Sequence, residues 1–217
     1  MRVVCISDTH LQHNFAVPDG DLLVHAGDAL NSGRPISELQ TFLYWFKNLP
    51  HRRKVYVPGN HDWLFDPDFM ISRRLAALEM MRDTDIHLLI DQEIELDGLR
   101  IYGSPWQPEF YGWAFNLPRG GEQLRRRWAA IPEGLDVLIT HGPPEGVLDR
   151  NTGDERCGCE LLRERVRVVR PRLHVFGHIH SGYGRVISDG IEFVNAAVCT
   201  EQYRPLNPPQ VVELSPR

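Results

Sequence analysis

One pattern along this chain constrains its fold more than any other: a short apolar run that ends in a small polar cluster. In residues 55–62, three apolar residues are followed by Pro-Gly and then by Asn, His and Asp. A buried strand that ends in this way delivers polar side chains to a loop at its carboxyl end, where open α/β sheets place their sites. Taken alone, the stretch is equally compatible with a strand followed by an ordinary turn.

The same pattern occurs at five strand ends. The apolar runs are residues 2–7, 21–25, 54–57, 136–140 and 173–176. The polar residues that follow them are Asp8 and His10, Asp28, Asn60 and His61, His141, and His178 and His180. Each cluster alone can be explained as a turn, but five strand ends with the same chemistry predict one shared site. The other five histidines (His13, His25, His51, His87 and His174) are interpreted as structural.

The rest of the pattern predicts an α/β fold. Helical periodicity or helix-ending prolines indicate helices over residues 37–48, 68–81, 123–130 and 159–169. The Asp-Gly pairs at 97–98 and 189–190 predict two hairpins, 93–96 with 99–102 and 185–188 with 191–194. Residues 211–214 are predicted to form a last edge strand. With 217 residues and no Gly- or Ser-rich linker, residues 1–217 are expected to form a single domain.

Composition limits the classes of partner. With a net charge of −5, the chain has no overall positive charge that would attract nucleic acid or an anionic membrane. Neither long nucleic acid nor a membrane is therefore expected as a partner. The basic run Arg125 to Arg127 is interpreted as a solvated helix face. The four cysteines do not suggest a disulfide framework, and Cys157-Gly158-Cys159 is interpreted as the approach to a helix. Without a signal segment or a long apolar run, a cytoplasmic location is expected.

Residues 103–121 form a long segment without usable periodicity. Five aromatic residues, from Trp106 to Phe115, lie among three prolines. A loop of this kind either packs on itself or forms a wall of a binding cleft, and the sequence favours neither.

The residue types at the five strand ends point to a metal centre. Carboxylate, imidazole and amide oxygen without thiolate suit Mn²⁺, Fe²⁺ or Zn²⁺. Seven candidate ligands are too many for one ion and fit two ions that share a carboxylate. Two ions about 3.5–4 Å apart can activate a bridging water and clamp both the attacking and the leaving oxygen of an in-line displacement at phosphorus.

The order Asp-x-His, Gly-Asp, Gly-Asn-His-Asp, His-Gly, Gly-His-x-His resembles the calcineurin-like metallophosphoesterase superfamily, and the resemblance spans Asp8 to His180. Three further stretches, residues 102–106, 113–116 and 139–144, are similar to small phosphodiesterases called metallophosphoesterase-domain-containing proteins. The resemblance implies a four-layer sandwich, with two mixed β-sheets flanked by helices and a dimetal site at the carboxyl ends of the strands.

The resemblance also implies a role for each residue of the motif. Asp8, His10 and His180 would hold one metal, Asn60, His141 and His178 the other, and Asp28 would bridge the two. His61, together with Asn60, would contact the substrate phosphate, and His61 would protonate the leaving oxygen.

One position departs from the family pattern. Many members have a second Asp three residues after the bridging one, where it orients the catalytic His, and here that position is Asn31. An amide can hold the ring but cannot stabilise an imidazolium as a carboxylate does, so proton donation from His61 is expected to be weaker. Asp62 is a candidate to compensate.

The function expected from the sequence is dimetal-dependent hydrolysis of phosphodiester bonds by in-line attack of a metal-bridging hydroxide. The expected partner is a small phosphorylated substrate, and a cyclic nucleotide is one candidate. The alternatives are a phosphomonoesterase, including one that acts on phosphoprotein, and a nucleotide- or metal-binding regulator with low turnover. The substitution at Asn31 is the feature that favours the regulator.

Overall fold

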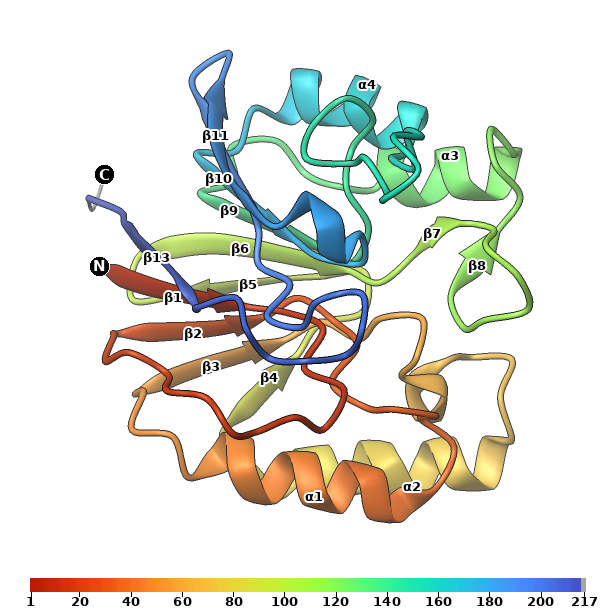
Figure 1. The fold of residues 1–217 in the computed structure, drawn as a ribbon, viewed down its shortest axis with the longest axis vertical. Coiled ribbons are helices and arrows are strands. Elements are labelled where there is room, and N and C mark those ends of the chain that lie inside the picture. Colours follow the sequence, from red (N-terminus) through yellow and green to blue (C-terminus); the bar gives the residue numbers. More distant parts are fainter. Residues whose placement is uncertain (216–217) are drawn as a thin grey trace.

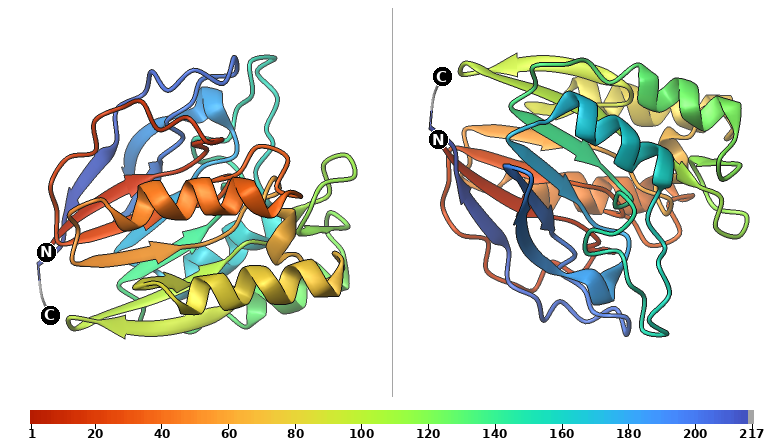
Figure 2. Two further views of the ribbon diagram at one scale, coloured as in Figure 1. Left: turned by 90° about the horizontal axis from the view of Figure 1, so that it is seen from below. Right: turned by 90° about the horizontal axis from the view of Figure 1, so that it is seen from above.

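Two β-sheets lie face to face between two pairs of helices in the computed structural model, which describes residues 1–215 (Figure 1). Helices α1 (Ile36–Lys47) and α2 (Ile71–Arg82) cover the outer face of one sheet, and α3 (Glu122–Ala129) and α4 (Glu160–Val169) cover the other (Figure 2). These four layers confirm the predicted α/β sandwich of two mixed sheets. The organisation of residues 1–217 as a single domain stays a prediction.

The first sheet has five strands in the order β13-β1-β2-β3-β4. Strands β1 to β4 run parallel to one another, and β13 pairs antiparallel with β1 at the edge, where the sequence predicts an edge strand. The bounds are β1 (Arg2–Ile6), β2 (Leu22–His25), β3 (Arg53–Tyr56), β4 (Ile86–Leu88) and β13 (Gln210–Glu213).

The second sheet has six strands in the order β11-β12-β10-β9-β6-β5. Its four inner strands are parallel, and the two outer strands pair antiparallel through the predicted hairpins. Asp97 and Gly98 both have positive φ, as a two-residue primed turn requires. The bounds are β5 (Gln92–Leu96), β6 (Leu99–Ser104), β9 (Val137–Thr140), β10 (Leu173–Phe176), β11 (Gly184–Ser188) and β12 (Ile191–Asn195).

Side-chain alternation along the strands builds two separate hydrophobic cores. In β1, Val3 and Cys5 pack in a cluster with residues of the second sheet such as Val137, whereas Val4 and Ile6 pack with the helices. Strands buried on both faces read as continuous apolar runs because each face must be covered. This explains why the runs at 2–7 and 136–140 show no polar alternation.

Helix α2 and strand β4 differ from the prediction. Helix α2 begins at Ile71 instead of residue 68, because the main-chain N–H of Asp68 donates to Asp66 Oδ1 (2.8 Å) and that of Phe69 to Asp66 O (3.2 Å), which forms a turn. Strand β4 was not predicted, since its three residues are too few for a pattern. No helix among residues 1–215 is long and apolar enough to cross a bilayer.

The aromatic segment 103–121 divides between the core and the surface. Trp106 and Phe115 are buried and meet edge to face, with their ring centroids 5.5 Å apart. Directly after these two residues, β7 (Gln107–Pro108) and β8 (Asn116–Leu117) form a two-stranded parallel ladder that projects from the body of the fold (Figure 1). The remaining aromatic residues of the segment lie beside the candidate site.

The remaining local predictions are consistent with the structure. Cys159 accepts a hydrogen bond from the main-chain N–H of Leu162 (Sγ to N, 3.4 Å) at the start of α4, and all four cysteines are free thiols. Arg125, Arg126 and Arg127 each form an ion pair, so the run is a helix face bridged to acidic neighbours.

Candidate metal centre

The carboxyl ends of the two sheets meet at a seam, and the candidate ligands gather there. Ser7 and Ala197 form an isolated bridge between the segments that follow β1 and β12, and the N–H of Val198 donates to Ser7 O (2.9 Å). The loops after β1, β2 and β3 supply ligands from one sheet, and those after β9 and β10 supply them from the other. The structure therefore brings the five predicted strand ends together.

Strained main-chain geometry aims these side chains. Four of the predicted ligands have a positive φ angle, which residues other than glycine rarely adopt. They are Asp8 (53°), His10 (44°), Asp28 (55°) and His178 (66°). Such conformations cost about 1–3 kcal/mol each and persist at functional sites where the surrounding structure enforces them. The turns after the strands are thus built to present particular side chains.

The ligand atoms form two groups on either side of the Asp28 carboxylate, and a third group, of His10, Asp28 and His61, overlaps both. In the first group, His180 Nε2 lies 3.3 Å from Asp8 Oδ1 and 3.4 Å from His10 Nε2. In the second group, which also includes His178, His141 Nε2 lies 2.8 Å from Asn60 Oδ1 and 3.4 Å from Asp28 Oδ1. The other oxygen, Asp28 Oδ2, faces His10 Nε2 at 3.9 Å. Asp28 therefore lies between the two groups.

Main-chain carbonyls fix the ring orientation of three histidines. The Nδ1 atoms contact Leu30 O (3.3 Å), Ala26 O (3.0 Å) and Thr200 O (3.0 Å) in His10, His141 and His180 respectively. Because a carbonyl only accepts, each Nδ1 must carry the proton, and this assignment leaves a lone pair on each Nε2. Outer partners of this kind orient metal-binding imidazoles in proteins.

The result is a centre in which acceptor atoms face one another. His141 Nε2 faces two oxygens and His180 Nε2 faces a carboxylate, so a cation is needed to hold them together. Burial alone would lower the pKa of both histidines. The carboxylate of Asp28 instead raises the pKa of His141 to about 9, and the carboxylate of Asp8 raises the pKa of His180 to about 9. A proton or a divalent ion satisfies this arrangement, and the donor set fits the two ions that the sequence predicts.

The other two histidines of the centre are neutral at physiological pH. Burial lowers the pKa of His10 to about 4 and that of His178 to about 3, which nearby carboxylates only partly offset. A neutral imidazole is the form that binds a metal, so these rings need no deprotonation before an ion enters.

Asp62 supports the turn that carries Asp28. Its carboxylate accepts hydrogen bonds from the main-chain N–H groups of Asp28 (2.9 Å), Ala29 (3.4 Å), Leu30 (2.9 Å) and Gly59 (2.7 Å). Burial, together with the charge of Asp28, raises the pKa of Asp62 to about 6. The expectation that Asp62 compensates for Asn31 at His61 is therefore wrong, because its oxygens are engaged by the main chain.

His61 is held by Asn31, but not by its side chain. The Nδ1 of His61 is hydrogen-bonded to the main-chain carbonyl oxygen of Asn31, and the N–H of His61 donates to Asp28 Oδ1 (2.8 Å). The ring thus obtains its orientation from the backbone at the position where the family pattern has a second Asp.

Three aromatic rings surround the centre, and one of them was missed in the sequence. Trp113 stacks on His61 with centroids 4.2 Å apart, and Phe110 meets His178 at 5.7 Å. Tyr203 meets His10 at 4.7 Å and His180 at 5.7 Å. Tyr203 comes from a turn after Cys199 with no periodicity or motif. The positive φ of Tyr203 (56°) is visible only in the structure.

A cavity of about 550 Å³ opens over the centre. The metal-centre residues at its base are His10, Asp28, Asn60, His61, His178 and His180, and its walls include Phe110, Tyr203, Arg119, Arg156 and Glu155. The five histidines interpreted as structural lie outside the groups of potential metal ligands among the described residues. The volume is in the range of small-molecule sites.

This fold and this centre define a metal-dependent phosphoester hydrolase. The calcineurin-like phosphoesterase family matches residues 1–182, and the chain belongs to that family. Over 98% of its length it is 47% identical to 71% of metallophosphoesterase domain-containing protein 1 from Homo sapiens. It is also 40% identical to UPF0046 protein K07C11.7 from Caenorhabditis elegans, over 95% of this chain and 74% of that protein.

Solved structures confirm the fold at lower sequence similarity. The phosphopantetheinyl hydrolase PptH from Mycobacterium tuberculosis superposes with a TM-score of 0.64 at 17% identity, covering 99% of this chain and 96% of that one. The protein TT1561 of Thermus thermophilus superposes with a TM-score of 0.56 at 15% identity, covering 89% and 88% of the two chains.

Proposed function

We propose that this protein hydrolyses phosphodiester bonds of a small phosphorylated substrate, with a cyclic nucleotide as one candidate. The observation that carries the proposal is the convergence of two ligand groups on Asp28 at the base of a cavity of about 550 Å³. Asp8, His10 and His180 would hold one divalent ion, Asn60, His141 and His178 the other, and Asp28 both. Mn²⁺, Fe²⁺ and Zn²⁺ are the ions that this donor set suits.

When bound, two such ions lower the pKa of a water molecule and withdraw charge from the phosphoryl oxygens. His61 would act as the general acid. Its Nδ1 is bonded to the carbonyl of Asn31, so Nε2 is the nitrogen available to the substrate. Proton donation to the leaving oxygen contributes about 10²–10⁴ to the rate. The amide of Asn60 and the ring of His61 would contact the phosphate.

The charges around the cavity support a small substrate over a long nucleic acid. The cavity wall mixes both signs, with Arg119, Arg156, Glu109, Glu155 and Glu201 outside the metal centre. A protein that tracks a phosphate backbone needs a continuous basic groove, because each neutralised phosphate adds to affinity. With a net charge of −5, the chain as a whole offers no such field.

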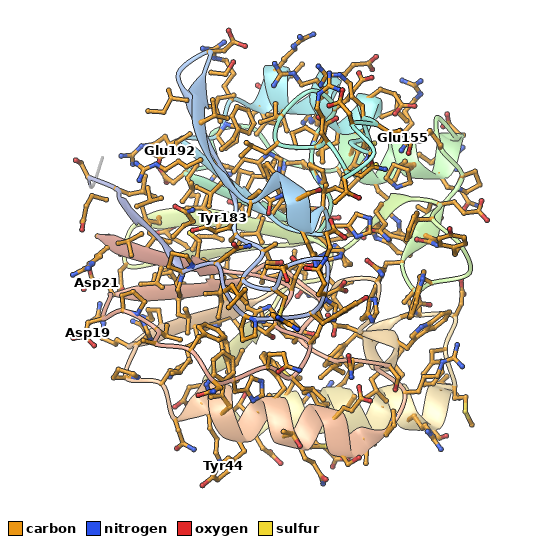
Figure 3. The ribbon with its side chains drawn as sticks, in the orientation of Figure 1. Asp19, Asp21, Tyr44, Glu155, Tyr183 and Glu192 are labelled. Atoms are coloured by element: carbon orange, nitrogen blue, oxygen red, sulfur yellow. The ribbon has the colours of Figure 1, made fainter. Side chains whose placement is uncertain are left out.

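The test is hydrolysis of bis-p-nitrophenyl phosphate against p-nitrophenyl phosphate, with and without added Mn²⁺. We expect turnover of the diester that requires the metal and that falls by at least about a hundredfold in Asp28→Ala, since removing even an outer partner of a ligand costs 10–100-fold. Asp19→Ala, at an exposed aspartate on a loop, is the matched control (Figure 3).

The same experiment separates the alternatives. Preference for the monoester would replace the diesterase by a phosphomonoesterase, including one for phosphoprotein. Bound metal without turnover of either compound would favour the binding regulator and would contradict the proposal.

A further inference from the structure

Phe110, Trp113 and Tyr203 form an aromatic collar around the metal centre. Two separate segments supply it: Phe110 and Trp113 come from the loop between β7 and β8, and Tyr203 comes from the turn between β12 and β13. Phe110 is 49% exposed and Tyr203 is 45% exposed, and both line the cavity. Partly exposed aromatic rings at the mouth of a cavity offer apolar surface to a ligand.

Hydrogen bonds hold the collar in place. Asn116 Nδ2 donates to the main-chain oxygens of Phe110 (3.0 Å) and Tyr111 (2.9 Å), which fixes the tip of the β7–β8 loop. The N–H of Tyr203 donates to Thr200 O (2.8 Å), and the N–H of Thr200 donates to Arg204 O (2.8 Å). The rings of Phe110 and Tyr203 therefore lie on ordered turns. This order lowers the entropy cost when a ligand binds against them.

Two of the rings lie on the His61 side of the centre, and the third lies beside His178. Trp113 stacks on His61 with ring centroids 4.2 Å apart, whereas Tyr203 contacts His10 at 4.7 Å and comes within 6.4 Å of His61. One face of Trp113 is covered by His61, so Tyr203 offers the more open ring next to the proposed general acid. Phe110 lies beside His178, in the other ligand group.

We propose that Tyr203 stacks on a planar leaving group and that Phe110 stacks on a planar group retained on phosphorus. The inference rests on the proposed function, because the leaving oxygen must lie next to His61 to receive its proton. The substrate class is then a phosphodiester whose two ester groups each carry a flat π system, such as an aryl ring or a nucleobase; a cyclic nucleotide, whose two ester oxygens share one base, would use only one of the two rings. Stacking of this kind is tolerant of ring identity and raises affinity by about 5- to 150-fold per ring.

The test compares phenyl p-nitrophenyl phosphate with ethyl p-nitrophenyl phosphate, which share a leaving group and differ in the retained group. The parent protein with Mn²⁺ is expected to favour the phenyl ester by about tenfold in kcat/KM. Phe110→Leu should bring this ratio close to one. Tyr203→Leu should instead lower kcat/KM for both esters by a similar factor, mainly through KM, and Tyr203→Phe should restore it.

Tyr44→Leu is the matched control, because Tyr44 projects from the outer face of α1, away from the cavity (Figure 3). It should leave both esters unaffected. A parent ratio near one overturns the inference, and so does a Phe110→Leu ratio equal to the parent's. An effect of Tyr203→Leu on kcat alone, without rescue by Tyr203→Phe, would assign Tyr203 a structural role instead.

A binding measurement separates this inference from the proposed function. Calorimetry with Mn²⁺-saturated protein should give about tenfold tighter binding of phenyl phosphate than of ethyl phosphate. This preference should vanish in the double variant Phe110→Leu/Tyr203→Leu. A preserved affinity ratio without diester turnover would overturn the proposed function only, whereas diester turnover with equal affinities would overturn the collar only.

Discussion

His61 and Asp62 are adjacent in the sequence and serve different parts of the site. The ring of His61 lines the cavity and is oriented by the carbonyl of Asn31, whereas Asp62 is fully buried. In the sequence both residues belong to one polar cluster that follows β3. Only the hydrogen bonds from the main chain around Asp28 show that Asp62 is a positioning residue.

Asp62→Asn tests this positioning role. The amide keeps one acceptor oxygen but turns an N–H₂ group toward main-chain N–H donors, and at least one of them loses its acceptor. We expect the free energy of unfolding to fall by about 1–3 kcal/mol and the affinity for Mn²⁺ to fall by about 10–100-fold. Urea denaturation and calorimetric titration measure the two effects.

Asp68→Asn, at an exposed position before α2, is the control and should change neither quantity. Unchanged Mn²⁺ affinity in Asp62→Asn would show that the Asp28 turn holds without this carboxylate.

At the level of single residues, the sequence predicts a set of candidate ligands that the structure brings close together, because these residues follow strands directly. Asp8, Asp28 and His141 lie one to three residues past the last residue of a strand, so their placement depends on little more than strand order. Tyr203 lies eight residues past the last residue of β12, in a turn that the pairing of Cys199 with Pro205 closes. No local pattern encodes that contact, and the residue was therefore missed.

At the level of elements, strands and helices with strong patterns were predicted, and weak ones were not. Helix α1 buries Leu39, Phe42, Leu43 and Phe46 on one face and matched its predicted position within one residue at either end. Helix α2 buries only Ala77 and Met81, so its hydrophobic periodicity is weak. The predicted start at residue 68 therefore differs from the observed start at Ile71. Element boundaries thus depend on local turns, such as the one at Asp66, that compete with helix formation.

The approach of the element ends to one another depends on glycine. A Cβ atom at Gly177 would lie 2.0 Å from Asp8 Oδ2 and 2.2 Å from Ser7 Oγ, so the end of β10 can approach the β1 loop only without a side chain. The main-chain N–H of the next residue, His178, donates to the same Asp8 carboxylate. Gly177 therefore couples the ends of the two sheets.

Gly177→Ala is expected to displace Asp8 and separate the ligand groups. Overpacking of this kind costs about 1–3 kcal/mol, and the Mn²⁺ affinity should fall with it. Thermal denaturation with and without Mn²⁺ gives both effects, because an ion that binds only the folded state raises its Tm. Gly112→Ala, where an added Cβ meets no atom within 4 Å, should behave as the parent protein. Equal metal-dependent shifts in the two variants would contradict the close-approach argument.

For the molecule as a whole, the two sheets carry matching buried histidines. His25 in β2 contacts Thr9 Oγ1 (2.9 Å), and His174 in β10 contacts Thr140 Oγ1 (2.8 Å). Thr140 Oγ1 also donates its proton to Gly142 O (2.8 Å), so it must accept from His174 Nε2. The Nδ1 of each of these two histidines is buried without a hydrogen-bond partner. The interpretation of both residues as structural is therefore consistent with the fold.

These two buried histidines are expected to make the whole fold less stable at acidic pH. Burial lowers the pKa of His25 and of His174 from 6.5 to about 3. Between pH 6.5 and 3 the unfolded chain binds a proton at each position and the folded chain does not, so stability falls as the pH falls through this window. Each histidine contributes a slope of about 1.4 kcal/mol per pH unit.

His174→Gln tests this directly, because the glutamine amide can still donate to Thr140 but does not titrate. Without metal, the free energy of unfolding of the His174→Gln variant should depend on pH less steeply than that of the parent protein. The difference in slope should be about 1.4 kcal/mol per pH unit between pH 6.5 and 3. Urea denaturation at several pH values measures the slope in both proteins. At pH 8 and above the pH dependence of the two should coincide, since His174 is neutral there in either state. Parallel curves below pH 6.5 would show that His174 accepts its second proton without cost, which its unpartnered Nδ1 in an apolar core argues against.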